Sequence, residues 1–412
     1  MTPLYRKITL RLVPYLMLLY FVAFLDRVNI SFAALTMNRD LGISDSLYGF
    51  AAGVFFLSYC LCEVPANLVL QRVGARRWLA ILLAVWGVIS IGTAFVDGRA
   101  EYIAARTLLG VAEAGFFPGI IFYYTTWLPR NLRSRVLALF LLSLPLCNCI
   151  GSPVSSHILL LNGFHGLKGW QWLFILEGTP AVLLGAITWR VLADRPETAR
   201  WLSLAEKVEL AQELGCDDAA ECAPVGRIAS HVARDALAYL MLQTGIYGLN
   251  FWLPKILAAQ GVAAADTGWW AAVPFGAGAV AMTGISRFKS HWWLGVTYGA
   301  AAAGFAWAAV AGTLLGFIGA FSLTTMAMYA ALPLFWSAST GRMSSRAAGA
   351  AIATVNSIGV TGGFVGPYAL GWLRDATRGE SAGMWMMAAV LAVGAAVVLT
   401  GPVRRGVPSH PQ

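Results

Sequence analysis

Long hydrophobic runs separated by short polar turns make up most of this 412-residue chain. Twelve such runs can be counted, and most reach the roughly 17–25 residues that a helix needs to cross a bilayer. The alternating pattern of an outer-membrane barrel strand is absent, so we expect helices. The expected segments are residues 12–36, 47–70, 78–96, 101–127, 136–161, 170–192, 236–259, 267–286, 292–312, 314–340, 346–372 and 384–401.

One long polar segment, residues 193–234, separates the first six hydrophobic runs from the last six. A weak repeat supports duplication, because FFPG…TTWLPRNLRSRVLAL in the first half has a counterpart in ALPLFWSASTGRMSSRAAGA in the second. We therefore predict an all-α integral membrane protein of twelve transmembrane helices in two six-helix bundles, residues 1–192 and 235–412. The linker at 193–234 contains a short amphipathic helix, LAEKVELAQEL.

Composition agrees with this architecture, since 58% of the residues are hydrophobic and only 12% are charged, whereas soluble proteins average about 25% charged residues. The lipid bilayer is therefore an expected partner. No cluster of His, Cys and acidic residues has metal-ligand spacing, and no nucleophile lies at a useful spacing from a base. We accordingly expect no enzyme, no metal and no cofactor.

The net charge of +9 reports orientation and leaves no basic patch for nucleic acid. Of 29 Lys and Arg residues, 21 fall at the termini and in the loops after even-numbered segments, and six fall in the loops after odd-numbered segments. This is the positive-inside bias, so both termini and the linker should be cytoplasmic in a multi-pass protein of the inner membrane.

Four charged residues lie inside hydrophobic segments of the first half, at Asp26, Arg27, Arg106 and Glu113. Each such charge costs about 2.5–3.5 kcal/mol at mid-membrane. Arg106 and Glu113 are seven residues apart and share a helix face, so one interpretation is that these charges form ion pairs that hold the bundle together. Buried ion pairs stabilise weakly, however, so a transport pathway or proton relay is the favoured interpretation.

The remaining buried acidic residues, Glu63 and Glu177, each precede a proline, and we expect them near the cytoplasmic ends of their helices in structural or gating roles. The second half has no charge in the middle of its segments. Its candidate site residues provide hydrogen bonds and shape instead: Tyr247, Asn250, Trp336 and Asn356.

Several long blocks resemble the anion:cation symporter family of the major facilitator superfamily: FLDRVNISFA, FLSYCLCEVPANLVLQRVGARRW, RTLLGVAEAGFFPG, GWQWLFILEGTPA, YGLNFWLPKIL and NSIGVTGGFVGPYALGW. Family members include proton-coupled uptake systems for sugar acids, tartrate and phthalate, and vesicular glutamate and lysosomal sialic-acid carriers. The resemblance implies that Arg27 and Arg106 bind the anion and that Asp26 and Glu113 carry protons. It also places three residues near the substrate: Tyr59, Trp336 and Asn356.

The loop between the second and third segments keeps four residues that we expect to act in gating: Arg72, Gly74, Arg76 and Arg77. Asn67 and Gln71 stand where the family usually has Gly and an acidic residue, which weakens the expected contact between loop and helix charges. Phe24 replaces a Tyr found in many members and makes the site less suited to a polyhydroxylated substrate.

The expected function is uptake of a small organic anion, a carboxylate, by proton-coupled symport and alternating access in a monomer. An anion that occupies the arginines removes the counter-charge from Asp26 and Glu113, so anion and proton binding favour each other. One alternative is a proton-coupled exporter of a metabolite or drug, although Gly151, Ser152 and Pro153 interrupt the adjacent Gly-Pro typical of such exporters. A non-transporting sensor is less favoured, because there is no soluble output domain.

The distribution of basic residues predicts that the C-terminus faces the cytoplasm. A cysteine introduced at Ser409 should not react with a membrane-impermeant thiol reagent added to intact cells, and should react once the cells are permeabilised. Labelling of intact cells would contradict this topology.

Overall fold

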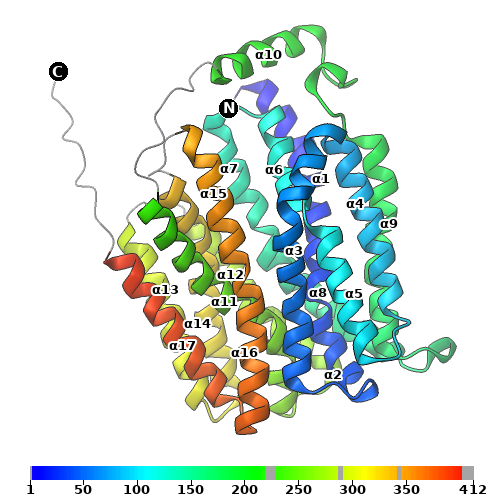
Figure 1. The fold of residues 1–412 in the computed structure, drawn as a ribbon, viewed down its shortest axis with the longest axis vertical. Helices are drawn as coiled ribbons and strands as arrows, with labels where there is room; N and C mark the ends of the chain where they lie inside the picture. The colour runs from blue at the N-terminus through cyan, green and yellow to red at the C-terminus, as the bar shows by residue number, and fades with distance from the viewer. Residues whose placement is uncertain (1, 219–228, 286–290, 341–344, 401–412) are drawn as a thin grey trace.

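The computed structural model describes residues 2–218, 229–285, 291–340 and 345–400, and these residues form helices joined by short turns (Figure 1). The first half contains α1 (Pro3–Val28), α2 (Ile30–Asp40), α3 (Asp45–Val73), α4 (Ala75–Thr93), α5 (Arg99–Glu113), α6 (Phe116–Trp127), α7 (Arg130–Leu141), α8 (Ser143–Ile158) and α9 (Gly169–Val191), with 3-10 turns at Leu159–Leu161, Phe164–Gly166 and Pro196–Thr198. After α10 (Leu204–Asp218) come α11 (Ala229–Ala259), α12 (Ala264–Gly284), α13 (His291–Val310), α14 (Leu314–Thr340), α15 (Ser345–Val360), α16 (Gly362–Thr377) and α17 (Ser381–Leu399).

Several of the expected transmembrane segments are broken helices. The pairs α1–α2, α5–α6, α7–α8 and α15–α16 each form one span, and the other long helices each form a span of their own. Within the described ranges, nine segments are long and apolar enough to cross a bilayer; α11, α12 and the α15–α16 pair complete twelve. The expected all-helical membrane architecture is therefore present.

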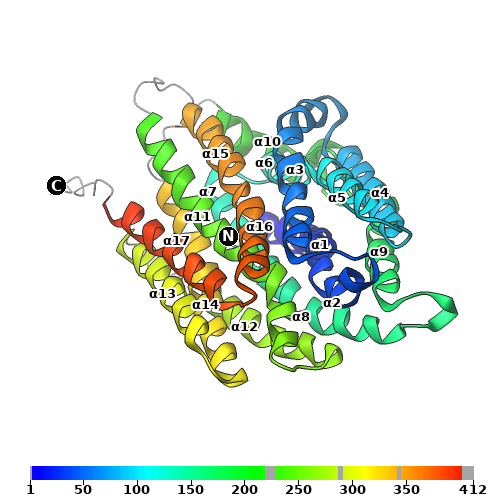
Figure 2. The same ribbon diagram turned by 60° about the horizontal axis from the view of Figure 1, so that its bottom comes forward.

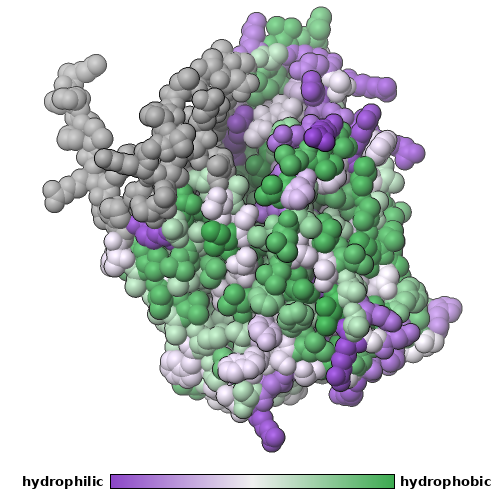
Figure 3. Space-filling view, viewed as in Figure 1, coloured by the Kyte–Doolittle hydropathy of each residue, from purple (hydrophilic) through white to green (hydrophobic). Residues whose placement is uncertain are grey.

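The two halves stand side by side, with α1–α9 in one bundle and α11–α17 in the other (Figures 1 and 2). The linker helix α10 and the N-terminus lie at the same end of the molecule (Figure 1). We call this the α10 end and the opposite end the far end. The space-filling view shows a broad hydrophobic belt between the two ends, where hydrophilic residues gather (Figure 3). Exposed Leu61 and Val280 belong to a surface that suits lipid.

Two of the helix breaks fall close to the charged residues that the sequence singled out. The break between α1 and α2 is at Asn29, two residues after Arg27. The break between α5 and α6 follows Glu113, and it contains Gly115 with φ +154, a conformation that favours glycine. A Cβ at Gly115 would also lie 2.8 Å from the Cβ of Ala66. Discontinuous helices of this kind are typical of transporter binding sites.

At the far end the two halves pack backbone to backbone through glycines. A Cβ on Gly49 of α3 would lie 2.3 Å from the carbonyl oxygen of Pro367 in α16, and one on Gly268 of α12 would lie 2.2 Å from the carbonyl oxygen of Ser152 in α8. Small residues allow membrane helices to approach this closely. The far end is therefore closed in this conformation.

The linker is attached to the first half. The Tyr5 hydroxyl donates to Glu213, and Lys7 Nζ lies 2.9 Å from Glu206. The rings of Trp127 and Trp201 stack with their centroids 5.4 Å apart. The expected amphipathic helix is thus present as α10, and it lies against the α10 end of the first bundle.

The glycine contacts predict that Gly49→Leu prevents closure of the far end, because the side chain would enter the α16 backbone. Spin labels on cysteines at Asp97 and Ala376 should report a longer distance in this variant than in a labelled parent. Gly92→Leu is the matched control, since nothing lies within 4 Å of a Cβ there. An unchanged distance in Gly49→Leu would refute the role of this contact.

Candidate functional site in the central cavity

A cavity of about 50 Å³ lies between the two halves and contains much of the predicted site. Its polar lining consists of Arg27, Gln243, Asn356 and the tyrosines Tyr20, Tyr59, Tyr239, Tyr247 and Tyr329. The rest is apolar or aromatic: Phe24, Phe117, Leu141, Leu144, Ile246, Leu332, Trp336 and Val360. Arg27 is the one cation among these residues, so an anion in the cavity has a single fixed charge to meet.

Arg27 connects the first half to the second. Its Nη2 and Nε donate to one carboxylate oxygen of Glu113 at 2.6 and 3.2 Å, and the second Glu113 oxygen has no hydrogen-bond partner. Its Nη1 donates to the Tyr247 hydroxyl at 3.4 Å across the interface. Arg27 is 7% exposed and Glu113 is fully buried. The pair is therefore an ion pair at the cavity wall, with one guanidinium nitrogen directed to the opposite half.

Arg106 lies behind this wall and does not line the cavity. Its guanidinium carbon is 5.1 Å from the centre of the Phe55 ring, and that of Arg27 is 5.0 Å from the same centre. Arg106 is 1% exposed, and none of its three side-chain nitrogens has a hydrogen-bond partner. The sequence placed Arg106 and Glu113 on one face, but in this conformation Glu113 pairs with Arg27 instead.

Asp26 points away from the cavity into the first bundle. One carboxylate oxygen accepts hydrogen bonds from Ser90 of α4 and, at 3.0 Å, from Asn29; the other has no partner. Asp26 is 1% exposed. The adjacent side chains of Asp26 and Arg27 therefore point in different directions, that of Asp26 into the first bundle and that of Arg27 to the cavity wall.

Asn356 is held by Glu63 on the α10 side of the cavity. The Glu63 carboxylate accepts from Asn356 Nδ2 at 3.1 Å and from the Ser357 hydroxyl at 3.0 Å, both in α15. Tyr59 lies one helical turn before Glu63 and lines the cavity. These contacts join the two halves on the α10 side of the cavity, which suits the gating role expected for Glu63.

Asn250 is next to the cavity without lining it. Tyr329 donates to Asn250 Oδ1 at 3.4 Å and accepts from Asn148 Nδ2 of the first half at 3.1 Å. Tyr329 was missed by the sequence analysis, although it precedes Trp336 by seven residues and so shares its helix face. That spacing is the signal that could have found it.

A cluster of ions at the far end was also not predicted. The Asp45 carboxylate of α3 contacts Lys255 Nζ of α11, and it lies 3.2 Å from Arg374 Nε of α16. Both Lys255 Nζ and the Arg374 guanidinium carbon lie over the Trp252 ring, at 5.0 and 5.6 Å. The sequence showed these residues only as separate loop charges, whereas folding brings them together across the interface.

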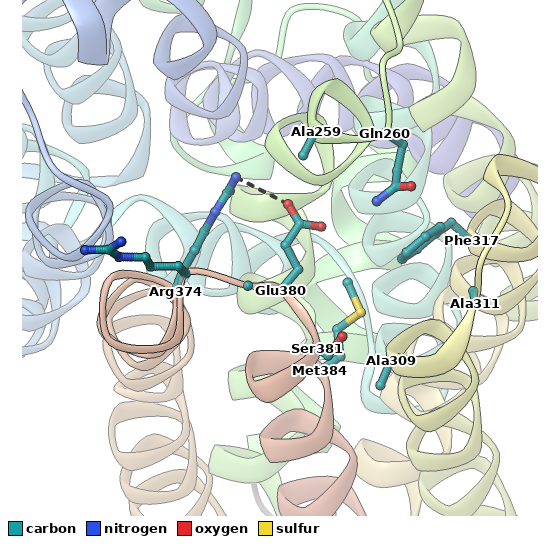
Figure 4. A pocket seen from close by; sticks show the side chains of 11 residues that line it. Ala259, Gln260, Ala309, Ala311, Phe317, Arg374, Glu380, Ser381 and Met384 are labelled. Atoms are coloured by element: carbon teal, nitrogen blue, oxygen red, sulfur yellow. Dashed lines mark ion pairs between the residues drawn. The ribbon is translucent and has the colours of Figure 1, made fainter.

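A second cavity of about 370 Å³ opens beside this cluster, between the ends of α11, α14 and α17 (Figure 4). Arg374 and Glu380 form its ion pair, 3.3 Å apart. Burial raises the pKa of Glu380 to about 7, although Arg374 opposes the shift. This cavity is lined by residues of the second half alone. It is therefore not a site between the halves whose access could alternate between the two sides of the membrane.

The predicted gating loop makes one defined contact. Arg76 Nε lies 3.3 Å from Asp194, which also accepts from the Arg76 backbone at 3.0 Å. Gly74 has φ +87, and a Cβ there would lie 3.1 Å from Asp194. Arg72 and Arg77 are exposed.

Glu177 corrects one expectation about position. It is the ninth residue of the 23-residue α9 and lies nearer the far end than the α10 end. The direction of the sixth span explains this, because α9 begins at the far end and Glu177 comes early in it. Glu177 accepts from the Ser155 hydroxyl at 2.6 Å inside the first bundle.

The architecture and the central cavity agree with a comparison to known families, in which residues 16–367 match the family model described as Major Facilitator Superfamily. The chain belongs to this superfamily. The curated relatives that match this chain are named as transporters and not as enzymes, so the chain is a multi-pass membrane transporter.

Two curated relatives match over nearly their full length. A protein of Agrobacterium vitis named "Putative tartrate transporter" is 43% identical, over 97% of this chain and 94% of that protein. The "Quinolone resistance transporter" of Acinetobacter baumannii is 36% identical, over 94% of this chain and 92% of that protein. Both names describe transport, with different cargo.

Solved structures support the fold. A bacterial homologue of the human lysosomal transporter Spinster, in an inward-facing and occupied conformation, aligns with a TM-score of 0.76 at 17% identity, over 97% of each chain. The xylose transporter XylE of E. coli, in a partially occluded inward-open conformation, gives 0.76 at 12% identity, over 97% of this chain and 99% of that chain.

The geometry predicts that Arg27→Lys weakens binding of a carboxylate, because lysine keeps the charge and loses the planar fork. One lost charge-assisted hydrogen bond costs about 1.5–3 kcal/mol, or roughly a tenfold to hundredfold loss of affinity. Arg106→Lys tests the second arginine in the same way. Binding of L-tartrate and its diamide to purified protein by calorimetry would measure both effects.

Undiminished affinity in both lysine variants would show that the arginines only hold the bundle together. Equal binding of the diamide and the acid would show that the cargo is not an anion.

Proposed function

We propose that this transporter takes up a small organic carboxylate together with protons. The observation that carries the proposal is the Arg27–Glu113 pair at the cavity wall. A substrate carboxylate offers Arg27 the same chemical group that Glu113 offers it, so the two compete for one guanidinium.

Competition for Arg27 provides the coupling. When the substrate takes the guanidinium, Glu113 loses its counter-charge in a site that water does not reach, and the protonated carboxyl becomes the favoured form. Substrate binding then promotes proton binding, and proton binding frees Arg27 for substrate by the same free energy. Asp26, buried in the same bundle, is the second proposed proton carrier.

Orientation follows from the basic residues, whose distribution assigns the α10 end to the cytoplasm. With the far end closed, the conformation would then face inward. The Glu63–Asn356 contact would act as the inner gate and the Asp45–Lys255–Arg374 cluster as part of the outer gate. Both lie across the interface that alternating access must open and close.

The cargo class follows from the cavity lining. One cation and two amides, Gln243 and Asn356, face a surface rich in aromatic rings. This favours a monocarboxylate, or a compact diacid whose groups fit one basic cluster, with its body against Trp336 and Tyr247. The Agrobacterium vitis relative makes tartrate the first diacid to test.

Export remains the second candidate, because the Acinetobacter baumannii relative bears the name of a resistance transporter. Uptake of labelled L-tartrate and of a monocarboxylate series into right-side-out vesicles, with an inward proton gradient imposed, separates the two. Accumulation that collapses with a protonophore supports symport. Loss of preloaded substrate driven by the same gradient would instead support exchange for protons.

The coupling scheme predicts that Asp26→Asn and Glu113→Gln each abolish or severely impair proton-driven accumulation, because an amide cannot exchange a proton. At least one variant should keep binding or exchange, since an amide resembles the protonated acid. Proteoliposome uptake and counterflow would measure the two activities separately. Wild-type accumulation by both variants would mean that these residues are structural.

A further inference from the structure

The buried charges of the first bundle do not balance. Four carboxylates, Asp26, Glu63, Glu113 and Glu177, are each at most 6% exposed, and two guanidiniums, Arg27 and Arg106, accompany them. Glu113 has Arg27 as its ion-pair partner. Ionised groups without a partner are very costly inside a membrane protein. Two guanidiniums cannot balance four ionised carboxylates, so further positive charge is needed in this bundle.

Glu177 is where that charge is missing. One carboxylate oxygen of Glu177 accepts from the neutral Ser155 hydroxyl at 2.6 Å, and its second oxygen has no hydrogen-bond partner. Among the described residues, no cation forms an ion pair with Glu177. Asp26 of α1, a like charge, lies close by: a Cβ on Gly178, the residue after Glu177, would lie 3.1 Å from the Cβ of Ser90, and the Ser90 hydroxyl donates to Asp26.

Asn29 connects Glu177 to Asp26. Its amide nitrogen donates to Asp26 at 3.0 Å, and its side chain lies beside Glu177. Asn29 Oδ1, Asp26 Oδ2 and Glu177 Oε2 are all buried and all lack a hydrogen-bond donor. Three neighbouring side chains thus each present an unused acceptor, which is the arrangement that a bound proton relieves.

We infer that Asp26 and Glu177 form one shared proton site, bridged by Asn29 and separate from the Arg27–Glu113 pair. Two close carboxylates cannot both ionise cheaply, so the pair takes up a proton as a unit. Glu113 and Arg106 of α5 face Asp26 with opposite charges, which leaves the shared proton as the balancing charge. The inference rests on the proposed proton-coupled function and adds Glu177 to the residues that carry it.

The test is the number of protons moved per substrate in proteoliposomes, using L-tartrate or whichever carboxylate the wild type transports. In Glu177→Gln the pair holds one carboxylate, Asp26, which Arg106 balances, so we expect one proton fewer per substrate. Counterflow exchange should persist, because the cavity is unchanged. Glu177→Asp should restore the wild-type number. Glu209→Gln, which removes an exposed carboxyl from α10, is the matched control.

Ser155→Ala keeps the carboxyl and removes its hydrogen-bond donor, so it tests the site even if Glu177→Gln does not reach the membrane. The variant should hold the proton more tightly, and half-maximal uptake should shift to higher pH. Wild-type stoichiometry in Glu177→Gln, or an unchanged pH profile in Ser155→Ala, would overturn the inference. Absence of proton movement in the wild type itself would instead refute the proposed function.

Discussion

The structure depends on holding ionised groups inside a bundle surrounded by lipid. Arg27 and Glu113 meet this constraint by pairing at 2.6 Å in a buried position at the cavity wall. Such a pair contributes little to stability, because desolvation offsets most of the attraction. Under the proposed mechanism, an incoming carboxylate replaces Glu113 at Arg27 only when Glu113 is neutralised. The free-energy cost of leaving Glu113 ionised without a partner would then couple substrate binding to proton binding.

The Arg27–Glu113 pair lies where the two halves of the molecule meet. Arg27 donates to the Tyr247 hydroxyl of the second half. Glu63 accepts a hydrogen bond from Asn356 of α15 on the α10 side of the cavity. The far end is closed by glycine contacts and by Asp45 between two cations. The halves are also packed together extensively where α3 meets α16 and where α8 meets α12. Alternating access would have to separate these contacts at one end while each bundle moves as a unit around the site.

Much of the fold could be predicted from the sequence, because hydrophobic length and the distribution of basic residues follow directly from the thickness and charge asymmetry of membranes. The charged residues of the site were found for the same reason, since Asp26, Arg27, Arg106 and Glu113 stand out in apolar helices. Their partners were not. The pairing of Arg27 with Glu113 depends on the break at Gly115 and on how α1 meets α5, which no single helix face reveals.

Residues that are neither charged nor isolated were the hardest to find. Tyr329 and Asn148 meet only across the interface, and Lys255 and Arg374 looked like ordinary loop charges until folding placed Asp45 between them. Glu177 was assigned to the wrong part of its helix. For the interface residues the missing information was the packing of elements far apart in the chain, whereas for Glu177 it was the position of the residue along a span that begins at the far end.

Protonation of Glu113 on substrate binding is the core of the proposed mechanism, and it can be measured without transport. Purified protein in weakly buffered solution is mixed with saturating amounts of the carboxylate that stabilises it most in a thermal-shift series, and the proton change is followed with a pH indicator. The wild type should take up protons when substrate binds, and Glu113→Gln should bind substrate with at least one proton fewer taken up. Substrate binding to the wild type with no proton uptake, or equal uptake by Glu113→Gln, would contradict the mechanism.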